Sequence, residues 1–233
     1  MIKNDKEIAD IRRACEITDL CFTEILKAIK PGVTEKKIAF QLEKLFSKYG
    51  VEPAFPVIVA FGKHTSMVHY LDAKKSITRA GIREIILLDF GVKVNGYCSD
   101  MTRMVFVGKP QAGWIRAYDA IRTIQQSCID KIRVLHGKHF SGASMDRFAR
   151  ALIKKANLPP YPHGLGHNLG RKIHELPRLS RKKDAQIVPG MVFTIEPGTY
   201  IKNAYGIRIE DTVLLKKNGI EILTKSPKTM LCL

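Results

Sequence analysis

Residues 85–107 constrain the fold more than any other part of the sequence. They begin with the apolar run Ile-Ile-Leu-Leu, reach Asp89, and pass through Asn95 and Gly96 to Asp100 and a second apolar run. An Asn-Gly pair between two such runs is a strong signal for a two-residue hairpin turn, because both residues tolerate a positive φ. We therefore expect a strand, a tight turn and an antiparallel strand here, with one aspartate in each arm.

The register of this hairpin would bring the two aspartates together. A two-residue turn places Asp89 opposite Thr102 and Asp100 opposite Gly91. Since side chains alternate across a strand, both carboxylates project from the same face, about 7–8 Å apart at the backbone. Asp is unusual inside a strand, and a buried carboxylate needs a cationic partner. Either a metal ion or Arg103 could be that partner.

Periodicity and capping signals place most of the remaining chain. Apolar residues recur at helical spacing before Pro31 and Gly32, which end the first helix. Thr34 and Ser144 each stand where a hydroxyl can cap a helix N-terminus. The expected helices cover residues 5–29, 35–48, 113–135 and 145–156, and the expected strands cover residues 56–61, 85–107, 191–196, 206–215 and 220–223.

A similar stretch occurs in both halves of the chain. The residues after Gly32 and those after Gly142 share a hydroxyl residue, an apolar residue, Ala and Leu at the same offsets. Each stretch precedes strands that carry carboxylates. Two capped amphipathic helices can resemble each other by chance. If the repeat is real, two α+β halves face each other and a site lies between them.

The segment 163–175 holds three of the seven histidines, His163, His167 and His174, interleaved with glycines. Glycines let the backbone turn sharply and pack closely, and imidazole binds transition metals and transfers protons near neutral pH. The spacing differs from the His-Glu-x-x-His pattern of single-zinc helices. His64 lies outside this segment, and we expect it to be exposed and without a role.

Two glutamates follow in strand-like surroundings. Glu196 ends an apolar strand just before Pro-Gly, and Glu210 is expected in mid-strand with Arg208 on the same face. For Glu210 alone, a cross-strand pair with an arginine is the simpler interpretation. Together with the two aspartates and a histidine, the glutamates form an oxygen-rich ligand set with one nitrogen, which suits a pair of Mn, Co, Fe or Zn ions.

The composition limits the class of protein. Lys and Arg number 39 against 22 acidic residues, and the net charge of +17 permits weak contact with a polyanion, although the basic residues are scattered. No apolar run approaches the ~18 residues that cross a bilayer, so no membrane partner is expected. The five cysteines form no metal-like cluster, which indicates reduced thiols and a cytoplasmic location.

These motifs resemble the pita-bread metallopeptidases, a family that includes methionine aminopeptidases, Xaa-Pro aminopeptidases and prolidases. The matching stretches are LLDFGVKVNGYCSDMTR, HGLGHNLGRKIHE, MVFTIEPGTY and GIRIEDTVLL, and the resemblance extends over residues 5–225. It implies an α+β pita-bread fold, with two pseudo-symmetric α/β halves, a central curved antiparallel sheet and a metal site between the halves. It also implies two divalent metal ions held by Asp89, Asp100, His167, Glu196 and Glu210.

The resemblance further implies how these ligands are shared. Asp100 and Glu210 would bridge the two ions. Asp89 would complete the shell of one ion, and His167 with Glu196 would complete the shell of the other.

Roles for the neighbouring side chains follow from the same resemblance. Glu196 would act as general base and pass the proton to the leaving nitrogen. His174 would bind the scissile carbonyl oxygen, His69 the scissile nitrogen, and His163 the proline ring after the cleaved bond. Arg208 would support the acidic cluster from behind rather than react.

The histidines favour one branch of the family. Residues 55–62, which lead to His69, and also His163 are similar to the Xaa-Pro branch, which removes the residue before a proline. Asn168 and Leu176 depart from the residues that many members carry. The Xaa-Pro enzymes usually have an additional N-terminal domain, whereas this sequence begins at the catalytic domain.

We therefore expect a single metallopeptidase catalytic domain over residues 1–233. It would act on peptides with a free N-terminus, as a monomer or a homodimer. Three other interpretations remain open: a methionine aminopeptidase that removes initiator Met, a pita-bread binding module for nucleic acid or the ribosome, and a creatine-cleaving relative.

Overall fold

The computed structural model describes residues 2–76, 78–135, 138–181 and 184–233. Its helices are α1 (Asp5–Ile25), η1 (Leu26–Ala28), α2 (Glu35–Lys48), η2 (Gly62–Ser66), α3 (Ala112–Arg133) and α4 (Gly142–Lys155). Its strands are β1 (Glu52–Pro53), β2 (Ile58–Phe61), β3 (Glu84–Phe90), β4 (Val92–Val94), β5 (Tyr97–Cys98), β6 (Met101–Val107), β7 (Phe140–Ser141), β8 (Gly166–Asn168), β9 (Glu175–Leu179), β10 (Gln186–Ile187), β11 (Val192–Ile195), β12 (Gly198–Ile201), β13 (Tyr205–Arg208), β14 (Asp211–Lys216), β15 (Gly219–Ile222) and β16 (Leu231–Cys232).

The four expected helices are confirmed, with one cap in a different place. Thr34 caps α2 as predicted, because its Oγ1 accepts a hydrogen bond from Lys37 N. At α4 the cap is Ser141, whose Oγ accepts from Ser144 N at 3.0 Å, so the prediction of Ser144 as the cap is wrong. Ser141 is the cap because it directly precedes Gly142, where the helix begins, whereas Ser144 lies inside the first turn.

The hairpin of residues 85–107 has the predicted register. Asp89 pairs with Thr102, and Asn95 and Gly96 both have positive φ values, 50° and 83°. The ladder between β3 and β6 stops short of Gly91 and Asp100, the second pair that we expected. The strands approach closely at this break, since a Cβ on Gly91 would lie 1.8 Å from a backbone oxygen.

Two main sheets carry the fold. The first has the strand order β16-β6-β3-β2, and the second has the order β15-β14-β11-β8-β9. Neighbouring strands in these sheets are antiparallel, as expected, except that the short edge strand β16 pairs with β6 in parallel. The two sheets meet where Glu210 N donates to Thr102 O at 3.2 Å and Thr212 Oγ1 donates to Asp100 O at 2.7 Å.

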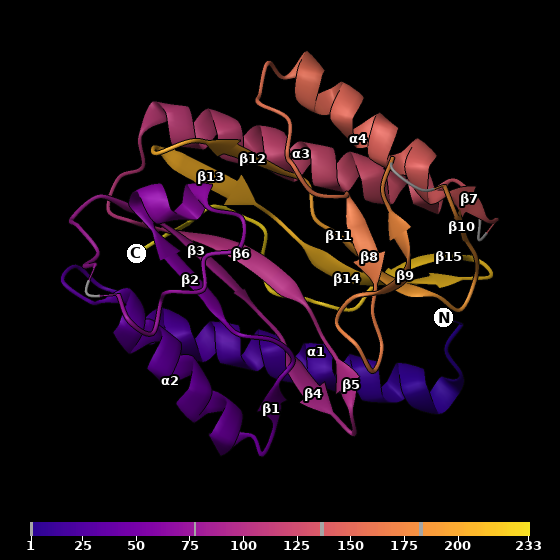
Figure 1. The fold of residues 1–233 in the computed structure, drawn as a ribbon, viewed down its shortest axis with the longest axis horizontal. Helices are drawn as coiled ribbons and strands as arrows, with labels where there is room; N and C mark the ends of the chain where they lie inside the picture. Colours follow the sequence, from indigo (N-terminus) through magenta and orange to yellow (C-terminus); the bar gives the residue numbers. More distant parts are fainter. Residues whose placement is uncertain (1, 77, 136–137, 182–183) are drawn as a thin grey trace.

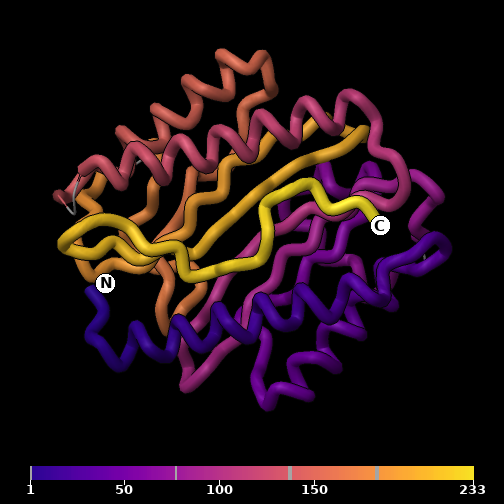
Figure 2. The backbone as a smooth tube through the Cα atoms, turned by 180° about the vertical axis from the view of Figure 1, so that it is seen from behind, coloured from indigo at the N-terminus to yellow at the C-terminus, as the bar shows by residue number. Residues whose placement is uncertain are grey.

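The same arrangement of helices and strands occurs in both halves of the chain, as the similar stretches predicted. Two helices (α1 and α2, then α3 and α4) each precede three consecutive antiparallel neighbours, β2-β3-β6 in the first half and β8-β11-β14 in the second. Figure 1 shows the helix pairs on opposite sides of the molecule with the strands between them, and Figure 2 shows the same from behind. The expected α+β fold of two facing halves is confirmed.

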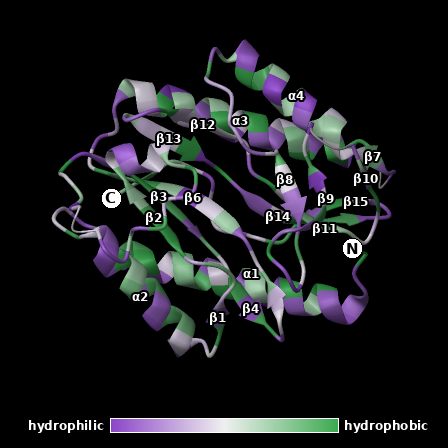
Figure 3. Ribbon diagram, in the orientation of Figure 1, coloured by the Kyte–Doolittle hydropathy of each residue, from purple (hydrophilic) through white to green (hydrophobic). Residues whose placement is uncertain are grey.

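One buried apolar cluster draws on both halves. It includes Phe22 of α1 and Phe61 of β2 together with Ile121 of α3 and Phe193 of β11, each at most 1% exposed. The helices carry both hydrophobic and hydrophilic residues along their length, as Figure 3 shows. Burial of the apolar helix faces against the strands is the main stabilising term for such a fold. Among the described helices, none combines the length and the apolar character that crossing a membrane requires.

Candidate active site

A cavity of about 420 Å³ lies between the two halves. Residues of both sheets and of the loops around them line it. All nine residues that the sequence singled out for the site contribute to this lining: His69, Asp89, Asp100, His163, His167, His174, Glu196, Arg208 and Glu210. The structure therefore places every one of these predicted residues at one cavity.

Asp89 lies near the end of β3, and its residue surface is 7% exposed. Its Oδ2 accepts a hydrogen bond from Arg208 Nη2 at 2.5 Å, so the arginine that meets it is Arg208 and not Arg103. Its Oδ1 is buried, and no described residue donates a hydrogen bond to it. A buried carboxylate oxygen without a donor is costly, and a cation is the natural partner.

Asp100 and Glu210 meet where the two sheets join. Asp100 lies just before β6, and Glu210 lies in the break between β13 and β14. The expectation that Glu210 lies in mid-strand is therefore wrong. The chain leaves the β12–β13 hairpin here and enters the second sheet, and Glu210 Oε2 accepts from Thr102 Oγ1 at 2.6 Å.

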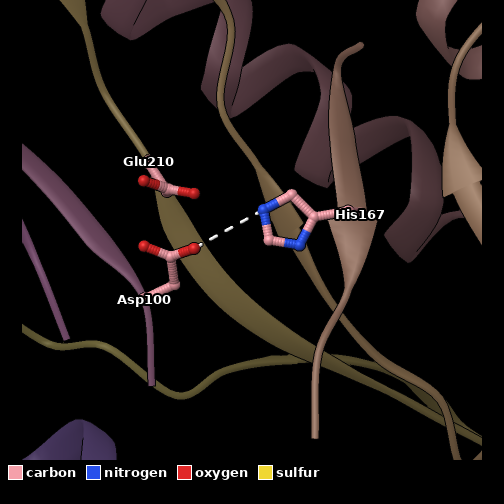
Figure 4. Close-up of side chains that lie close together, drawn as sticks. All are labelled: Asp100, His167 and Glu210. Atoms are coloured by element: carbon pink, nitrogen blue, oxygen red, sulfur yellow. Dashed lines mark ion pairs between the residues drawn. The ribbon is translucent and has the colours of Figure 1, made fainter. Parts of the chain in front are cut away.

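His167 completes a compact ligand-type group. It lies on β8, and its Nε2 is 3.5 Å from Asp100 Oδ2 and 3.6 Å from Glu196 Oε1. Asp100, His167 and Glu210 each offer an atom, and these atoms lie within 4.8 Å of one another. Figure 4 shows both carboxyl groups beside the imidazole ring. Nδ1 of His167 lies 3.2 Å from Asn168 O, which leaves Nε2 free to act as an electron-pair donor.

The electrostatics of the group favour a bound cation. Burial, and then the charges of the neighbouring carboxylates, raise the pKa of Asp100 and of Glu196 well above their usual values. The pKa of Glu210 rises to about 8 for the same reasons, with burial first and the charge of Asp89 second. Burial lowers the pKa of His167 to about 3, so its ring is neutral. Crowded carboxylates beside a neutral imidazole, with one orphaned oxygen, fit divalent metal ions.

The other three histidines of the site surround this group. Nε2 of His163 lies 3.0 Å from Tyr200 Oη, and Nδ1 lies 3.8 Å from Glu196 Oε2. His174 packs edge-on against His167 with ring centroids 4.4 Å apart, and both His174 and His69 are exposed. These positions allow His69 and His174 to reach a molecule that enters the cavity.

Sequence reasoning placed Arg208 behind the carboxylates but missed its hydrogen-bond partners Thr102 and Tyr200. Arg208 donates through Nε to Thr102 Oγ1 at 3.0 Å and through Nη1 to Tyr200 Oη at 2.8 Å. Tyr200 thereby connects Arg208 with His163. The β12–β13 register could have shown this, since Tyr200 pairs with Gly206 and its side chain therefore shares a face with Arg208.

Comparisons with known proteins agree with the geometry. The chain is 35% identical over 233 residues to the Xaa-Pro dipeptidase of Pyrococcus furiosus, with 99% of this chain and 65% of that protein covered. Among solved structures, it superposes on the X-Pro aminopeptidase from Thermotoga maritima MSB8 with a TM-score of 0.92 and 34% identity, over 100% of this chain and 64% of that one. The prolidase from Pyrococcus furiosus gives a TM-score of 0.89 and 35% identity, over 97% of this chain and 66% of that one.

The chain thus spans about two thirds of the length of these relatives. The structural similarity confirms the expected pita-bread fold. The model of the family described as metallopeptidase family M24 matches residues 9–217. A match over this much of the chain shows that it belongs to metallopeptidase family M24.

Proposed function

We propose that this protein is a metal-dependent peptidase that hydrolyses the first peptide bond of its substrates, with a preference for Xaa-Pro bonds. The observation that carries the proposal is the convergence of four carboxylates and one imidazole on a single cavity between the halves. Of these, Asp100, His167 and Glu210 are already close enough to hold one ion.

The donor set fits two divalent ions, of Mn, Co, Fe or Zn. Asp100 and Glu210 would contact both ions, Asp89 would contact one, and His167 with Glu196 would contact the other. The unpaired Oδ1 of Asp89 supports its place in this set. Two bound metal ions would lower the pKa of a water molecule and stabilise the negative charge of a tetrahedral oxyanion.

The residues around the set would divide the remaining work. Glu196 would accept a proton and return it to the leaving nitrogen. The exposed ring of His174 would donate to the scissile carbonyl oxygen, and that of His69 would contact the scissile nitrogen. His163 would pack on the substrate's proline ring, held by its contact with Tyr200. Arg208 would keep Asp89 in place through their 2.5 Å ion pair.

The lining of the cavity includes both apolar and cationic side chains, which bears on the substrate. The apolar ones include Phe55, Ile58 and Leu71. Arg178 and Arg181 also line the cavity and are exposed. An apolar N-terminal residue and a free C-terminal carboxylate would complement these side chains. This arrangement favours Xaa-Pro dipeptides over longer peptides as the better substrates, in line with the name of the Pyrococcus furiosus relative.

Turnover of a small peptide panel tests the proposal. The metal-free protein is reloaded with each ion in turn and assayed on Ala-Pro, Leu-Pro, an Ala-Pro-initiated peptide and a Met-Ala-initiated peptide. We expect metal-dependent hydrolysis of the Xaa-Pro substrates, fastest for Leu-Pro. Preferential release of Met would instead identify a methionine aminopeptidase. A complete lack of hydrolysis with every ion would favour a binding module.

A cytoplasmic location is part of the same proposal. All five cysteines are free, and only Cys232 is exposed. Unpaired thiols are typical of proteins that work in a reducing cytoplasm. The oligomeric state, monomer or homodimer, stays a prediction.

A further inference from the structure

The loop of residues 61–70, which begins at the last residue of β2 and includes η2, is closed at its base by a single carboxylate from α2. Glu35 is the first residue of α2, and it is completely buried. It does not belong to the residues that line the cavity. Its surroundings nevertheless connect it to the cavity wall through the loop of residues 61–70.

Three groups of this loop converge on Glu35. Phe61 N donates to Oε1 at 2.7 Å, His64 Nδ1 lies 2.9 Å from the same oxygen, and Tyr70 Oη donates to Oε2 at 2.9 Å. The rings of His64 and Tyr70 also stack, with centroids 4.6 Å apart and planes 25° from parallel. His64 is only partly exposed, so the expectation that it is exposed is wrong. The first and last residues of the loop are fixed to one side chain.

The part of the same loop that directly precedes Tyr70 forms part of the cavity wall. Val68 and His69 both line the cavity. The carbonyl oxygen of Val68 accepts a hydrogen bond from Arg208 Nη1 at 3.3 Å, and Arg208 Nη2 in turn contacts Asp89. Thr65 Oγ1 accepts from Gly206 N at 2.7 Å, which attaches the loop to β13. The position of the loop therefore decides where His69 stands relative to Asp89.

The three contacts to Glu35 are strong constraints on this loop. A buried carboxylate is stable only when donors surround it, and among the described residues all the donors to this one come from the loop. Closing the loop at its base also removes most of the conformational freedom that its central residues would otherwise have. A binding wall is precise only when a second layer of contacts holds it.

We propose that Glu35 is a positioning residue that holds the loop of residues 61–70, and with it His69 and Val68, in the conformation that binds substrate. The effect is on substrate affinity and not on metal binding, because the loop contributes none of the five carboxylate and imidazole ligands. The identity of the substrate in this proposal rests on the proposed function. The role of Glu35 in holding the loop rests on its contacts with Phe61, His64 and Tyr70.

The test uses three variants in the full chain. Glu35→Gln keeps one acceptor oxygen but loses the charge, Tyr70→Phe removes one hydrogen bond and keeps the ring stack, and Glu35→Ala removes all three contacts. The matched control is Tyr49→Phe, which removes a similar tyrosine bond to the carboxylate of Glu24, between α1 and α2 and away from the cavity.

We expect KM for Ala-Pro to rise about three- to tenfold in Tyr70→Phe and Glu35→Gln, and further in Glu35→Ala, with a smaller fall in kcat because His69 would contact the scissile nitrogen. Hydrogen exchange should quicken in residues 61–70 and stay unchanged in residues 85–107. The three variants should keep the metal affinity of the wild type. The control variant Tyr49→Phe should keep its KM, kcat and hydrogen exchange. An unchanged KM with unchanged exchange would overturn the proposal, as would an equal loss in metal affinity.

Failure of the two proposals can be told apart. If the wild type hydrolyses no peptide, the proposed function fails. Loop exchange and calorimetric binding of Ala-Pro then decide the role of Glu35 without turnover, since both readouts compare the variants with the wild type directly. Weaker Ala-Pro binding together with faster exchange in the loop supports the role of Glu35, and wild-type values for both overturn it.

Discussion

Arg103 Nη2 lies 2.6 Å from Asp211 Oδ1, in an ion pair whose side chains are 2% and 0% exposed. The same guanidinium donates to the carbonyl oxygens of Thr102 and Glu210. The pair therefore lies directly behind the point where the two sheets meet. It supports the backbone from which Glu210 reaches the cavity.

Loss of this ion pair should destabilise the whole chain. Although burial alone would raise the pKa of Asp211, Arg103 and Lys228 hold it below its usual value, so the group stays ionised. Asp211→Asn leaves a buried guanidinium without its counter-charge, and we expect a loss of about 3 kcal/mol in the free energy of unfolding by urea denaturation. Asp130→Asn, in the exposed pair with Arg133, should cost about 0–1 kcal/mol. Equal effects of the two substitutions would contradict this.

Removal of metal should make stability depend on pH in a defined direction. The folded-state pKa of Glu210 is raised to about 8 from 4.5, so the folded chain keeps a proton that the unfolded chain loses. This contribution to stability is complete below the unfolded pKa and is lost as the pH rises through the folded one. Urea denaturation of the metal-free protein should therefore give a lower free energy of unfolding at about pH 8 than at about pH 6.5.

The control for this pH effect is Glu210→Gln, which should show a smaller decline over the same range. Adding back a metal ion at about 100 times its Kd should raise the free energy of unfolding by about 2.7 kcal/mol. A metal-free protein whose stability did not fall in this range would show that the buried carboxylates are compensated in another way.

Substitution of Glu196 should separate proton transfer from metal binding. Glu196→Gln keeps the shape and one oxygen ligand but cannot accept a proton. At saturating metal we expect kcat on Ala-Pro to fall by at least about 10²-fold, with the metal content of the wild type by elemental analysis. Glu221→Gln, which alters a partly exposed pair with Arg12, should leave kcat unchanged. Normal turnover in Glu196→Gln with bound metal would assign the base to another group.

Substitution of Arg208 should weaken metal binding without touching a ligand. Arg208→Lys loses the planar contacts that hold Asp89, Thr102 and Tyr200 at once. We expect metal affinity by calorimetry to fall about 10- to 100-fold. Arg12→Lys, on the surface of α1, is the matched control. An unchanged affinity in Arg208→Lys would mean that Asp89 keeps its position unaided.

Local signals explain what could be predicted from the sequence. The pairing of Asp89 with Thr102 follows from the Asn95-Gly96 turn, because a two-residue turn fixes the register of everything on either side. The position of Glu196 follows similarly from the apolar run before it and the Pro-Gly after it. The gathering of all nine predicted residues at one cavity needed the family resemblance, since the two halves of the chain contribute separately.

Contacts between distant segments explain what could not be predicted. Arg208 meets Asp89 across 119 positions of sequence, whereas Arg103 is only fourteen residues from Asp89 and yet pairs with Asp211 on the other side of the sheet. Strand alternation explains this. Asp89 pairs with Thr102 and shares its face of the sheet, whereas Arg103, the next residue of β6, faces the opposite side. Glu35 and His64 meet in the same long-range way, and no spacing rule links the first turn of α2 to a loop after β2.

The meeting of the two sheets at Glu210 and Thr102 makes the two halves of the chain interdependent for binding. The first half carries Asp89 and Asp100, and the second carries His167, Glu196 and Glu210. Any ion that these residues hold acts as a cross-link between halves, so ion affinity and docking of the halves are linked free energies. A chain severed between β6 and α3 would then reassemble more tightly in the presence of the ion than in its absence.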